Sequence, residues 1–372
     1  MGRGRADRCL RVLMVSLQQP IEGQGARVHL DELRHELAEL GHGAELIEAR
    51  SGRAGLAGPL RLLAVQVRSV ARMGRADVVL ARFHPLLLPL AVICRLRRRT
   101  LVVEVNGTPD DLVALYPTAR ALLPLLRWTS RWTLRLADER IAVSDPLADW
   151  ATDLCGRAVT AVPNGANVER FRPEASWAGR PLPERYAVFV GRLAPWQGID
   201  LLVDALAHPA WPQDLALVVA GDGPRAPVLH EVARRDPRVV LLGTVPHDQV
   251  PGLIAGAVVA VAPRAPSGWH ASPLKVFEAL AAGTPVVATD LPGQAAPVRA
   301  SGGGRIVPTG DPTAFADTVA AIAGDRQLAG RLGTAGTRYV HDHASWALTA
   351  SRVEEVLHRA LQRDVRTVAG PR

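Results

Sequence analysis

The chain has 372 residues, which is too many for one compact core and suits two domains of ordinary size. Apolar residues make up 48% and charged residues 22%, a balance that excludes a disordered chain and is typical of a soluble globular protein. The net charge is +8, and residues 1–170 hold +6 of it, because 24 arginines there face 18 acids. Such a surface suits anionic partners, but no nucleic-acid-binding motif accompanies it, so we expect no nucleic acid partner.

The three cysteines, Cys9, Cys94 and Cys155, are far apart and show no spacing typical of a zinc site or a redox pair. We therefore expect a reducing, cytoplasmic compartment. The apolar run that follows the basic N-terminus is too short for a secretory leader, and no stretch approaches the ~20 apolar residues that cross a bilayer. A peripheral position at the inner face of a membrane stays open.

The first half of the chain predicts strands and helices in alternation. Residues 12–15 read as a strand, and a helical repeat of apolar residues follows and stops at Gly41. The runs AELIEA, ADVVLARF, TLVVEVNG and RIAVS read as further short strands. Unbroken apolar strands that alternate with helices indicate a parallel sheet covered on both faces.

A proline-rich segment, residues 171–185, separates this half from a second alternation of strands and helices. Three helices, near residues 314–323, 326–339 and 346–361, close the chain. We predict an α/β protein with two Rossmann-like parallel-sheet domains, at residues 1–170 and 186–345, and a C-terminal helix and tail at residues 346–372. Ligands of such sheets bind at the carboxyl ends of the strands, so a cleft between the domains is the expected site.

One lysine, Lys275, stands among 43 arginines. It lies in SPLKVFEAL, where Ser272 is a capping residue, Pro273 suits the first helical position, and the amides of Leu274 and Lys275 point out of the helix end. A cation there opposes the helix dipole unless an anion is bound. The alternative is a surface ion pair with Glu278, which an arginine would form equally well.

Five segments occur in an order and at spacings that resemble the family 4 retaining glycosyltransferases of the GT-B fold, in an SPLK-type variant. They are AVPNGANVERFRP, VFVGRLAPWQGIDLLVDAL, LVVAGDGP, VVLLGTVP and SPLKVFEALAAGTPVVATD, which together span residues 161–290. The first half resembles the acceptor domain of that family in EVNGTPDD and IAVSDPLADW. The resemblance implies a C-terminal helix that returns towards the first domain and transfer of a sugar, with retention, from a nucleotide diphosphate sugar to a hydroxyl. It implies no metal and no cofactor.

The resemblance also implies roles for residues of the second half. Glu278 would hold the ribose hydroxyls of the donor, Gly243, Thr244 and Val245 would face its base, and Arg192 would bind its diphosphate. We count Arg192, Lys275, Glu278 and Asn106 as catalytic candidates. The implied donor-binding set is Gly23, Gly25, Gly191, Arg192, Gln197, Gly243, Thr244, Val245, Arg264, His270, Ser272, Pro273, Leu274, Lys275 and Glu278.

Two departures from the family pattern bear on the donor. Gln197 stands where the family commonly has a lysine for the diphosphate, so Lys275 is expected to supply the missing charge, with Arg264 as a second candidate. His270 stands where the family commonly has a glutamate that contacts the donor sugar, which leaves the sugar open. These departures motivate a second hypothesis, a nucleotide-sugar-binding protein that has lost transfer. A phosphorylase-like enzyme is disfavoured because the sole lysine lies in a donor-type motif.

Candidate acceptor residues lie in the first half. Strand alternation places Glu104 and Asn106 on one side of a strand end, and His29 is a third candidate. For Asn106 a turn position before Gly107 is an equal alternative, and for His29 a packing role is favoured. Asp110 and Asp111 read as acids that begin a helix rather than as catalytic groups.

Other polar residues receive structural interpretations. Asn164 and Asn167 lie in PNGAN, where local turns explain them, although Asn164 could also contact ligand. His42 is expected at the surface.

Two basic stretches suggest a surface for an anionic membrane. In residues 95–100 four arginines follow one another closely, and in residues 122–136 Arg127, Arg131 and Arg135 are four apart, with Trp128 and Trp132 beside them. The second pattern is typical of an interfacial amphipathic helix. An ordinary solvated helix face is the alternative. The acceptor stays open between a glycan, a lipid-linked molecule and a small molecule.

Overall fold

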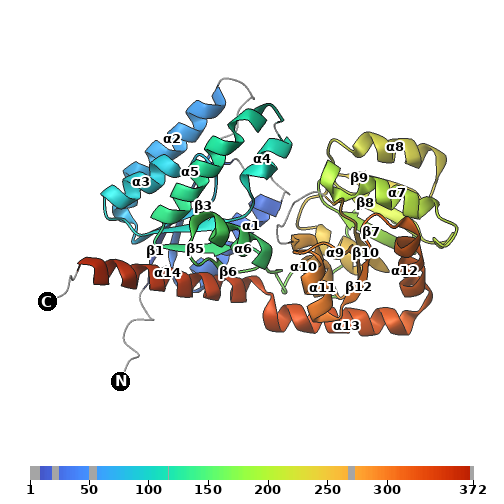
Figure 1. Cartoon of the computed structure of the whole chain (residues 1–372). Helices are drawn as coiled ribbons and strands as arrows, with labels where there is room; N and C mark the ends of the chain where they lie inside the picture. The colour runs from blue at the N-terminus through green and yellow to red at the C-terminus, as the bar shows by residue number, and fades with distance from the viewer. Residues whose placement is uncertain (1–8, 19–24, 50–56, 116, 267–272, 369–372) are drawn as a thin grey trace. The chain divides into compact units, whose positions relative to one another are not determined.

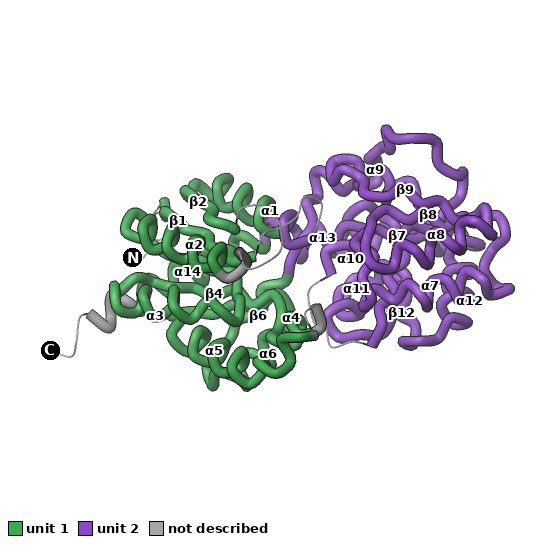
Figure 2. Tube along the Cα trace, turned by 90° about the horizontal axis from the view of Figure 1, so that it is seen from above, with its two compact units in different colours: residues 1–21, 29–163, 349–372 green, residues 22–28, 164–348 purple. Residues whose placement is uncertain are grey.

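The computed structural model describes residues 9–18, 25–49, 57–115, 117–266 and 273–368. The chain divides into two compact units, which Figure 2 shows in different colours. Unit 1 comprises residues 1–21, 29–163 and 349–372, and unit 2 comprises residues 22–28 and 164–348. The last segment of the chain thus belongs to the same unit as the first.

Unit 1 contains a six-stranded sheet in which all neighbouring strands are parallel, in the order β2-β1-β3-β4-β5-β6. Its strands are β1 (Arg11–Ser16), β2 (Gly43–Glu48), β3 (Val78–Arg82), β4 (Leu101–Val105), β5 (Glu139–Ala142) and β6 (Thr160–Ala161). Its helices are α1 (Gly25–Glu39, which begins in unit 2), α2 (Ala57–Arg72), α3 (Leu88–Leu96), α4 (Pro109–Leu115), α5 (Leu123–Leu136), α6 (Asp145–Cys155) and, from residue 349, α14 (Trp346–Val368), with short 3₁₀ turns η1 (Met73–Arg75) and η2 (Pro117–Leu122).

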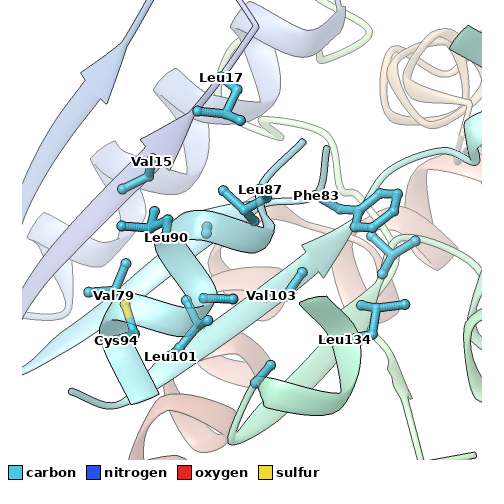
Figure 3. Close-up of a cluster of buried hydrophobic side chains, with 14 of the residues drawn as sticks. Val15, Leu17, Val79, Phe83, Leu87, Leu90, Cys94, Leu101, Val103 and Leu134 are labelled. Atoms are coloured by element: carbon cyan, nitrogen blue, oxygen red, sulfur yellow. The ribbon is translucent and has the colours of Figure 1, made fainter. Parts of the chain in front are cut away.

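Helices cover both faces of this sheet (Figure 1). One core joins the strands to α2, α3, α5 and α6, and Figure 3 shows Leu90 and Cys94 of α3 and Leu134 of α5 within it. A second core joins the opposite face to α1 and α14. Each of these parallel strands is buried on both faces of the sheet, so apolar residues occupy both of its sides. The strands therefore appear in the sequence as continuous apolar runs.

Unit 2 contains the second sheet, also parallel throughout, in the order β12-β11-β10-β7-β8-β9. Its strands are β7 (Tyr186–Val190), β8 (Ala216–Ala220), β9 (Val239–Gly243), β10 (Val259–Ala262), β11 (Val286–Thr289) and β12 (Gly304–Val307). Its helices are η3 (Pro195–Gln197), α7 (Ile199–Ala207), α8 (Ala226–Arg235), α9 (Val250–Ala255), α10 (Leu274–Ala281), α11 (Ala295–Ser301), α12 (Pro312–Gly324) and α13 (Arg326–His343).

The prediction of two Rossmann-like parallel sheets is confirmed. The three closing helices are also confirmed, as α12, α13 and α14. Among the described helices, none is both long and apolar enough to cross a membrane.

Candidate functional site

The strand order of unit 2 marks one position as a ligand site. From β7 the chain adds β8 and β9 on one side and then returns to add β10, β11 and β12 on the other. Helices that follow β7 and β10 therefore leave the sheet in opposite directions and open a crevice beyond the carboxyl ends of these two strands. In such sheets ligands bind at this switch point, so the residues that follow β7 and β10 are the first candidates for a ligand site.

The loop after β7 packs its backbone closely against the segment after β10. Gly191 has φ +135°, and Gly198 has φ +64°. A Cβ at position 198 would lie 2.8 Å from the backbone nitrogen of Arg264, and the amide of Ala265 donates to the carbonyl of Trp196 at 3.1 Å. Glycine is needed at both positions because a side chain would have to adopt a left-handed conformation or displace this contact.

Lys275 projects from the first turn of α10 to this crevice. Its Nζ donates to Oε1 of Gln197 at 2.8 Å and lies 4.0 Å from the centre of the buried Phe189 ring. A Cβ at position 191 would lie 3.1 Å from the same Nζ, so Gly191 makes room for it. The lysine and the glutamine that departs from the family pattern are thus direct partners.

The charge of Lys275 is held at a cost in free energy. Its burial, and then the positive charge of Arg264, lower the pKa of Lys275 from 10.5 to about 7, although Glu278 acts in the opposite direction. An anion beside the ammonium would favour the charged form and offset both effects. Nζ of Lys275 contacts Gln197, and Glu278 contacts His247 instead, so the structure does not show the Lys275–Glu278 ion pair that was the alternative explanation of this lysine.

Glu278 instead contacts a histidine that sequence reasoning missed. Its Oε1 lies 3.3 Å from Nε2 of His247, and Glu278 is buried. The ring of His247 packs against Phe171 with centroids 5.7 Å apart, and its Nδ1 lies 3.4 Å from Nη2 of Arg170. The only available signal was position, because His247 follows the predicted base-facing stretch by two residues.

The other donor candidates are distributed around the ends of the strands. Arg192 is exposed directly after β7 and Gly191, and Gly243 ends β9 with φ +67°, followed by Thr244 and Val245. Gly25 begins α1 in the short segment assigned to unit 2. The expected first helical residue, Pro273, is instead the residue before α10, which begins at Leu274. The predicted Gly23, His270 and Ser272 lie outside the described residues.

Unit 1 holds a separate polar cluster at the carboxyl end of β4. Nε2 of His29 lies 2.9 Å from Oε2 of Glu104, and Nδ2 of Asn106 donates to the same oxygen at 3.0 Å. The prediction that Glu104 and Asn106 share one side is thereby confirmed. Burial alone would raise the pKa of Glu104, but His29, Arg82 and Asn106 together outweigh it and lower this pKa to about 2. Glu104 is therefore a carboxylate at neutral pH.

Arg82 is the second residue that sequence reasoning missed. It ends β3 directly across from Glu104 in the parallel register, and burial lowers the pKa of its guanidinium. Its Nη1 is buried and makes no hydrogen bond to any described residue. A buried guanidinium with an unused N–H group beside a carboxylate is suited to bind a hydroxyl or an anionic group of a ligand.

Asp110, Asp111 and Asn167, which were assigned to structure, behave as predicted. Asp110 and Asp111 lie in the first turn of α4, and Oδ2 of Asp111 accepts from the amide of Thr108 at 2.6 Å. Oδ1 of Asn167 accepts from the amide of Arg170 at 3.2 Å, which closes a local turn. Helix starts and turns therefore account for these groups.

The prediction that His42 lies at the surface is wrong. His42 is buried, its Nδ1 accepts the amide of Leu10 at 3.1 Å, and its Nε2 lies 2.9 Å from Oε1 of Glu354 in α14. With His358, these groups form a triad with the ligand types of a metal site. Because Nδ1 of the neutral ring accepts a hydrogen bond, the proton is on Nε2, which donates to Glu354 and is not free to bind a metal. We read the group as a link between α14 and β2.

Comparison with known families matches both halves of the chain. The sequence model described as "Glycosyltransferase Family 4" matches residues 23–170, and the model described as "Glycosyl transferases group 1" matches residues 184–325. The phosphatidyl-myo-inositol mannosyltransferase of Mycobacterium leprae is 31% identical over 221 residues, which is 58% of this chain and 58% of that protein. The D-inositol 3-phosphate glycosyltransferase of Corynebacterium efficiens is 30% identical over 233 residues, 60% of this chain and 51% of the relative.

The fold also matches solved structures. The Anabaena protein HepE, solved in complex with UDP and glucose, aligns with a TM-score of 0.71 at 18% identity, covering 94% of this chain and 99% of HepE. At this identity the likeness concerns the fold alone. The sequence matches span little more than half the length of the curated relatives. Residues 23–170 therefore match a family 4 glycosyltransferase domain and residues 184–325 a group 1 glycosyltransferase domain, and the two parallel sheets have the GT-B fold.

Proposed function

We propose that this protein transfers a sugar from a nucleotide diphosphate sugar to an acceptor hydroxyl and that unit 2 binds the donor. The observation that carries the proposal is the position of Lys275, a partly buried ammonium beside Gly191 and Gln197 at the switch point of a Rossmann-like sheet. A diphosphate is the part of the donor that matches this chemistry, because it brings negative charge to a cation whose hydrogen-bond partner among the described residues is the neutral Gln197. The names of the relatives and the UDP complex of HepE support the same donor class.

In this proposal Lys275 supplies the charge that position 197 does not. Gln197 holds the ammonium by one hydrogen bond, which leaves other N–H groups of Lys275 for phosphate oxygens. The exposed Arg192, after β7, adds a second cation, and the first amides of α10 add hydrogen-bond donors. These fixed charges would stabilise the diphosphate as it leaves, an electrostatic effect that commonly dominates catalysis of this kind.

Glu278 is proposed to bind the ribose of the donor. Its carboxylate accepts hydrogen bonds from a diol, and its contact with His247 fixes the orientation of the acid. Gly243, which ends β9, and the following Thr244 and Val245 are proposed to face the base. The base stays open between uracil, guanine and others, and the sugar stays open with it.

The acceptor is proposed to bind unit 1 near Glu104. This carboxylate, with His29, Asn106 and Arg82, offers both hydrogen-bond acceptors and donors to a sugar or polyol hydroxyl. Retention would follow from attack on the face that the diphosphate leaves. The acceptor oxygen then bonds to the anomeric carbon, the bond to the phosphate oxygen breaks, and that oxygen takes the acceptor's proton. The family resemblance supports this course and implies no metal or cofactor.

A second candidate function is binding of a nucleotide sugar without transfer. The observations in its favour are Gln197 and His270 at positions where the family commonly has a lysine and a glutamate. Turnover separates the two functions: a transferase consumes donor only when an acceptor is supplied, whereas a binding protein is stabilised by donor and consumes none.

Thermal unfolding tests donor binding directly. We would compare the unfolding of wild type and Lys275→Ala in the presence of UDP, GDP, dTDP or ADP. The control is Arg299→Ala, which also removes one cation, but from an exposed position in α11. A nucleotide at 100 times its Kd should add about 2.7 kcal/mol to the unfolding free energy. Stabilisation of wild type and Arg299→Ala, but much less of Lys275→Ala, is expected. Equal stabilisation of all three proteins would contradict the role of Lys275.

A further inference from the structure

Two helices of unit 1 expose large apolar side chains, although their buried sides also hold polar residues. In α2 the buried side includes Gln66 and Ser69, whereas Leu60, Leu63 and Val67 are 67%, 53% and 60% exposed. Gln66 and Ser69 are satisfied internally, because Oε1 of Gln66 accepts the amide of Leu90 and the Ser69 hydroxyl donates to a carbonyl of its own helix. Because Val65 of α2 also lies in the core, this helix has apolar side chains on both its buried and its exposed side, which is unusual for a helix at a protein surface.

The second such helix is α5. Ser130 and Thr133 are buried, and the Ser130 hydroxyl donates to the carbonyl of Leu126 at 2.6 Å. Outside, Trp128 is 54% exposed and Trp132 is 41% exposed. Neither tryptophan is needed for the core, where Figure 3 places Leu134 of the same helix.

The helix between them, α3, is apolar on both sides. Leu90 and Cys94 enter the core (Figure 3), and Val92 and Leu96 are exposed. Because α3 contacts both α2 and α5, the three helices form one layer, the α2–α3–α5 face. All eleven large apolar side chains that are exposed among the described residues belong to unit 1, and ten lie on or within two residues of these helices. Unit 2 offers none in its described part.

The same face is strongly basic. The three helices contain seven arginines and no aspartate or glutamate. Some of this charge is compensated from outside, since Arg127 pairs with Asp110 and Arg72 with Glu45. Arg95 and Arg131 are exposed, and the guanidinium of Arg135 stacks on the ring of Trp132 at 5.5 Å. Exposed apolar side chains and uncompensated positive charge thus occur on one surface.

We propose that the α2–α3–α5 face docks on the surface of an anionic lipid bilayer. Leucine, valine and tryptophan side chains would enter the boundary between head groups and acyl chains, while the arginines would remain at the level of the lipid phosphates. Tryptophan favours this boundary, because its ring is apolar and its N–H group needs a polar partner.

Other occupants fit this face less well. A second copy of the chain would bring seven arginines against seven, without acids in the three helices to balance them. A nucleic acid would use the arginines but would leave Leu60, Leu63 and Val67 without a partner.

Vesicle sedimentation with the full chain tests the proposal. The vesicles are phosphatidylcholine alone or three parts phosphatidylcholine to one part phosphatidylglycerol, at low and at raised salt. We expect sedimentation with the anionic vesicles only. Arg95→Gln/Arg131→Gln should lower the partition coefficient roughly 25-fold at low salt, since each arginine near an anionic surface contributes about fivefold. Leu125→Ser/Trp128→Ser should lower it at least about tenfold at both salt concentrations.

The control pair is Arg34→Gln/Leu40→Ser, which removes one exposed arginine and the one exposed large apolar side chain outside the face among the described residues. It should bind as wild type does, and unchanged unfolding temperatures would show that every variant is folded. The proposal is overturned if the wild type does not sediment with anionic vesicles. It is also overturned if neither Arg95→Gln/Arg131→Gln nor Leu125→Ser/Trp128→Ser weakens binding. It is also overturned if the wild type binds DNA in preference to vesicles, or if Leu125→Ser/Trp128→Ser only dissociates a dimer in solution.

Discussion

Binding of the donor diphosphate should be coupled to uptake of a proton by Lys275. In the free protein the pKa of Lys275 is about 7, because burial and Arg264 disfavour the ammonium. A bound diphosphate adds negative charge beside Nζ and raises this pKa. At pH 8 about nine tenths of the free amine is neutral, so binding of one UDP should take up close to one proton, and about half a proton at pH 7. The apparent affinity for UDP should then fall about tenfold for each pH unit above 7.

Titration calorimetry in two buffers measures this proton directly. At pH 8 the observed enthalpies in HEPES and in Tris should differ by the number of protons taken up times the difference in buffer ionisation enthalpy. Lys275→Met has no group to titrate, so its two enthalpies should agree, whereas Arg299→Gln should behave as wild type does. Tight UDP binding by wild type with no proton uptake at pH 8, or equal uptake by Lys275→Met, would refute the reasoning.

Three further predictions concern other parts of the molecule. Glu104→Gln should lower the unfolding free energy at pH 7 by about 3 kcal/mol, because the pKa of Glu104 is about 2 in the folded protein against an ordinary 4.5. The difference between the two proteins should vanish as the pH of a denaturant titration falls from 4.5 to 2, since the carboxylate is then protonated. Gly191→Ala should cost about 1–3 kcal/mol of stability in the same titration, because φ is +135° there, and it should also weaken UDP binding, because its Cβ would lie 3.1 Å from Nζ of Lys275. Iodoacetamide should modify only Cys9 in the native protein, since Cys94 and Cys155 are buried and burial raises the pKa of Cys94 to about 12; rapid labelling of Cys94 in mass spectrometry would contradict this.

The fold could be predicted from sequence because its signals are local. A strand buried on both faces is a continuous apolar run, and alternation along β4 places Glu104 and Asn106 together without knowledge of the rest of the chain. Lys275 stood out for a different local reason, which is its rarity among arginines. Its hydrogen-bond partner was not predicted, because helix geometry points only to Glu278, three residues away, and not to Gln197, 78 residues away.

The residues that were missed depend on contacts between distant segments. Arg82 meets Glu104 through the register of β3 on β4, and His42 meets Glu354 across 312 residues. The α2–α3–α5 face was only partly foreseen, from the tryptophans of α5. Helical periodicity shows which residues share a side, but it did not show that α2 has apolar side chains on both sides, with Val65 in the core and Leu60, Leu63 and Val67 exposed.

We infer that the proposed donor site favours lysine at position 275 in a protein that otherwise uses arginine, because lysine can lose its proton when no anion is bound. The buried guanidinium of Arg140 is held by the carbonyls of Leu134 and Ala137, and that of Arg82 lies beside Glu104, whereas Lys275 has an amide oxygen and a ring. Arginine cannot lose its proton, so at this position it would remain an unbalanced buried charge whenever the donor is absent. Lysine can become neutral when the site is empty and charged when the diphosphate arrives.

Lys275→Arg tests this explanation. The unfolded wild type binds more protons than the folded protein between pH 7 and about 10.5, so wild-type stability should gain up to about 1.4 kcal/mol per pH unit there relative to the variant. The comparison is made by denaturant unfolding at pH 6, 7, 8 and 9 without nucleotide. The difference at pH 6, where both side chains are charged, measures the steric cost of the larger arginine. If the difference between wild type and Lys275→Arg stays constant from pH 6 to pH 9, Lys275 does not release its proton in the empty site, and the preference for lysine has another origin.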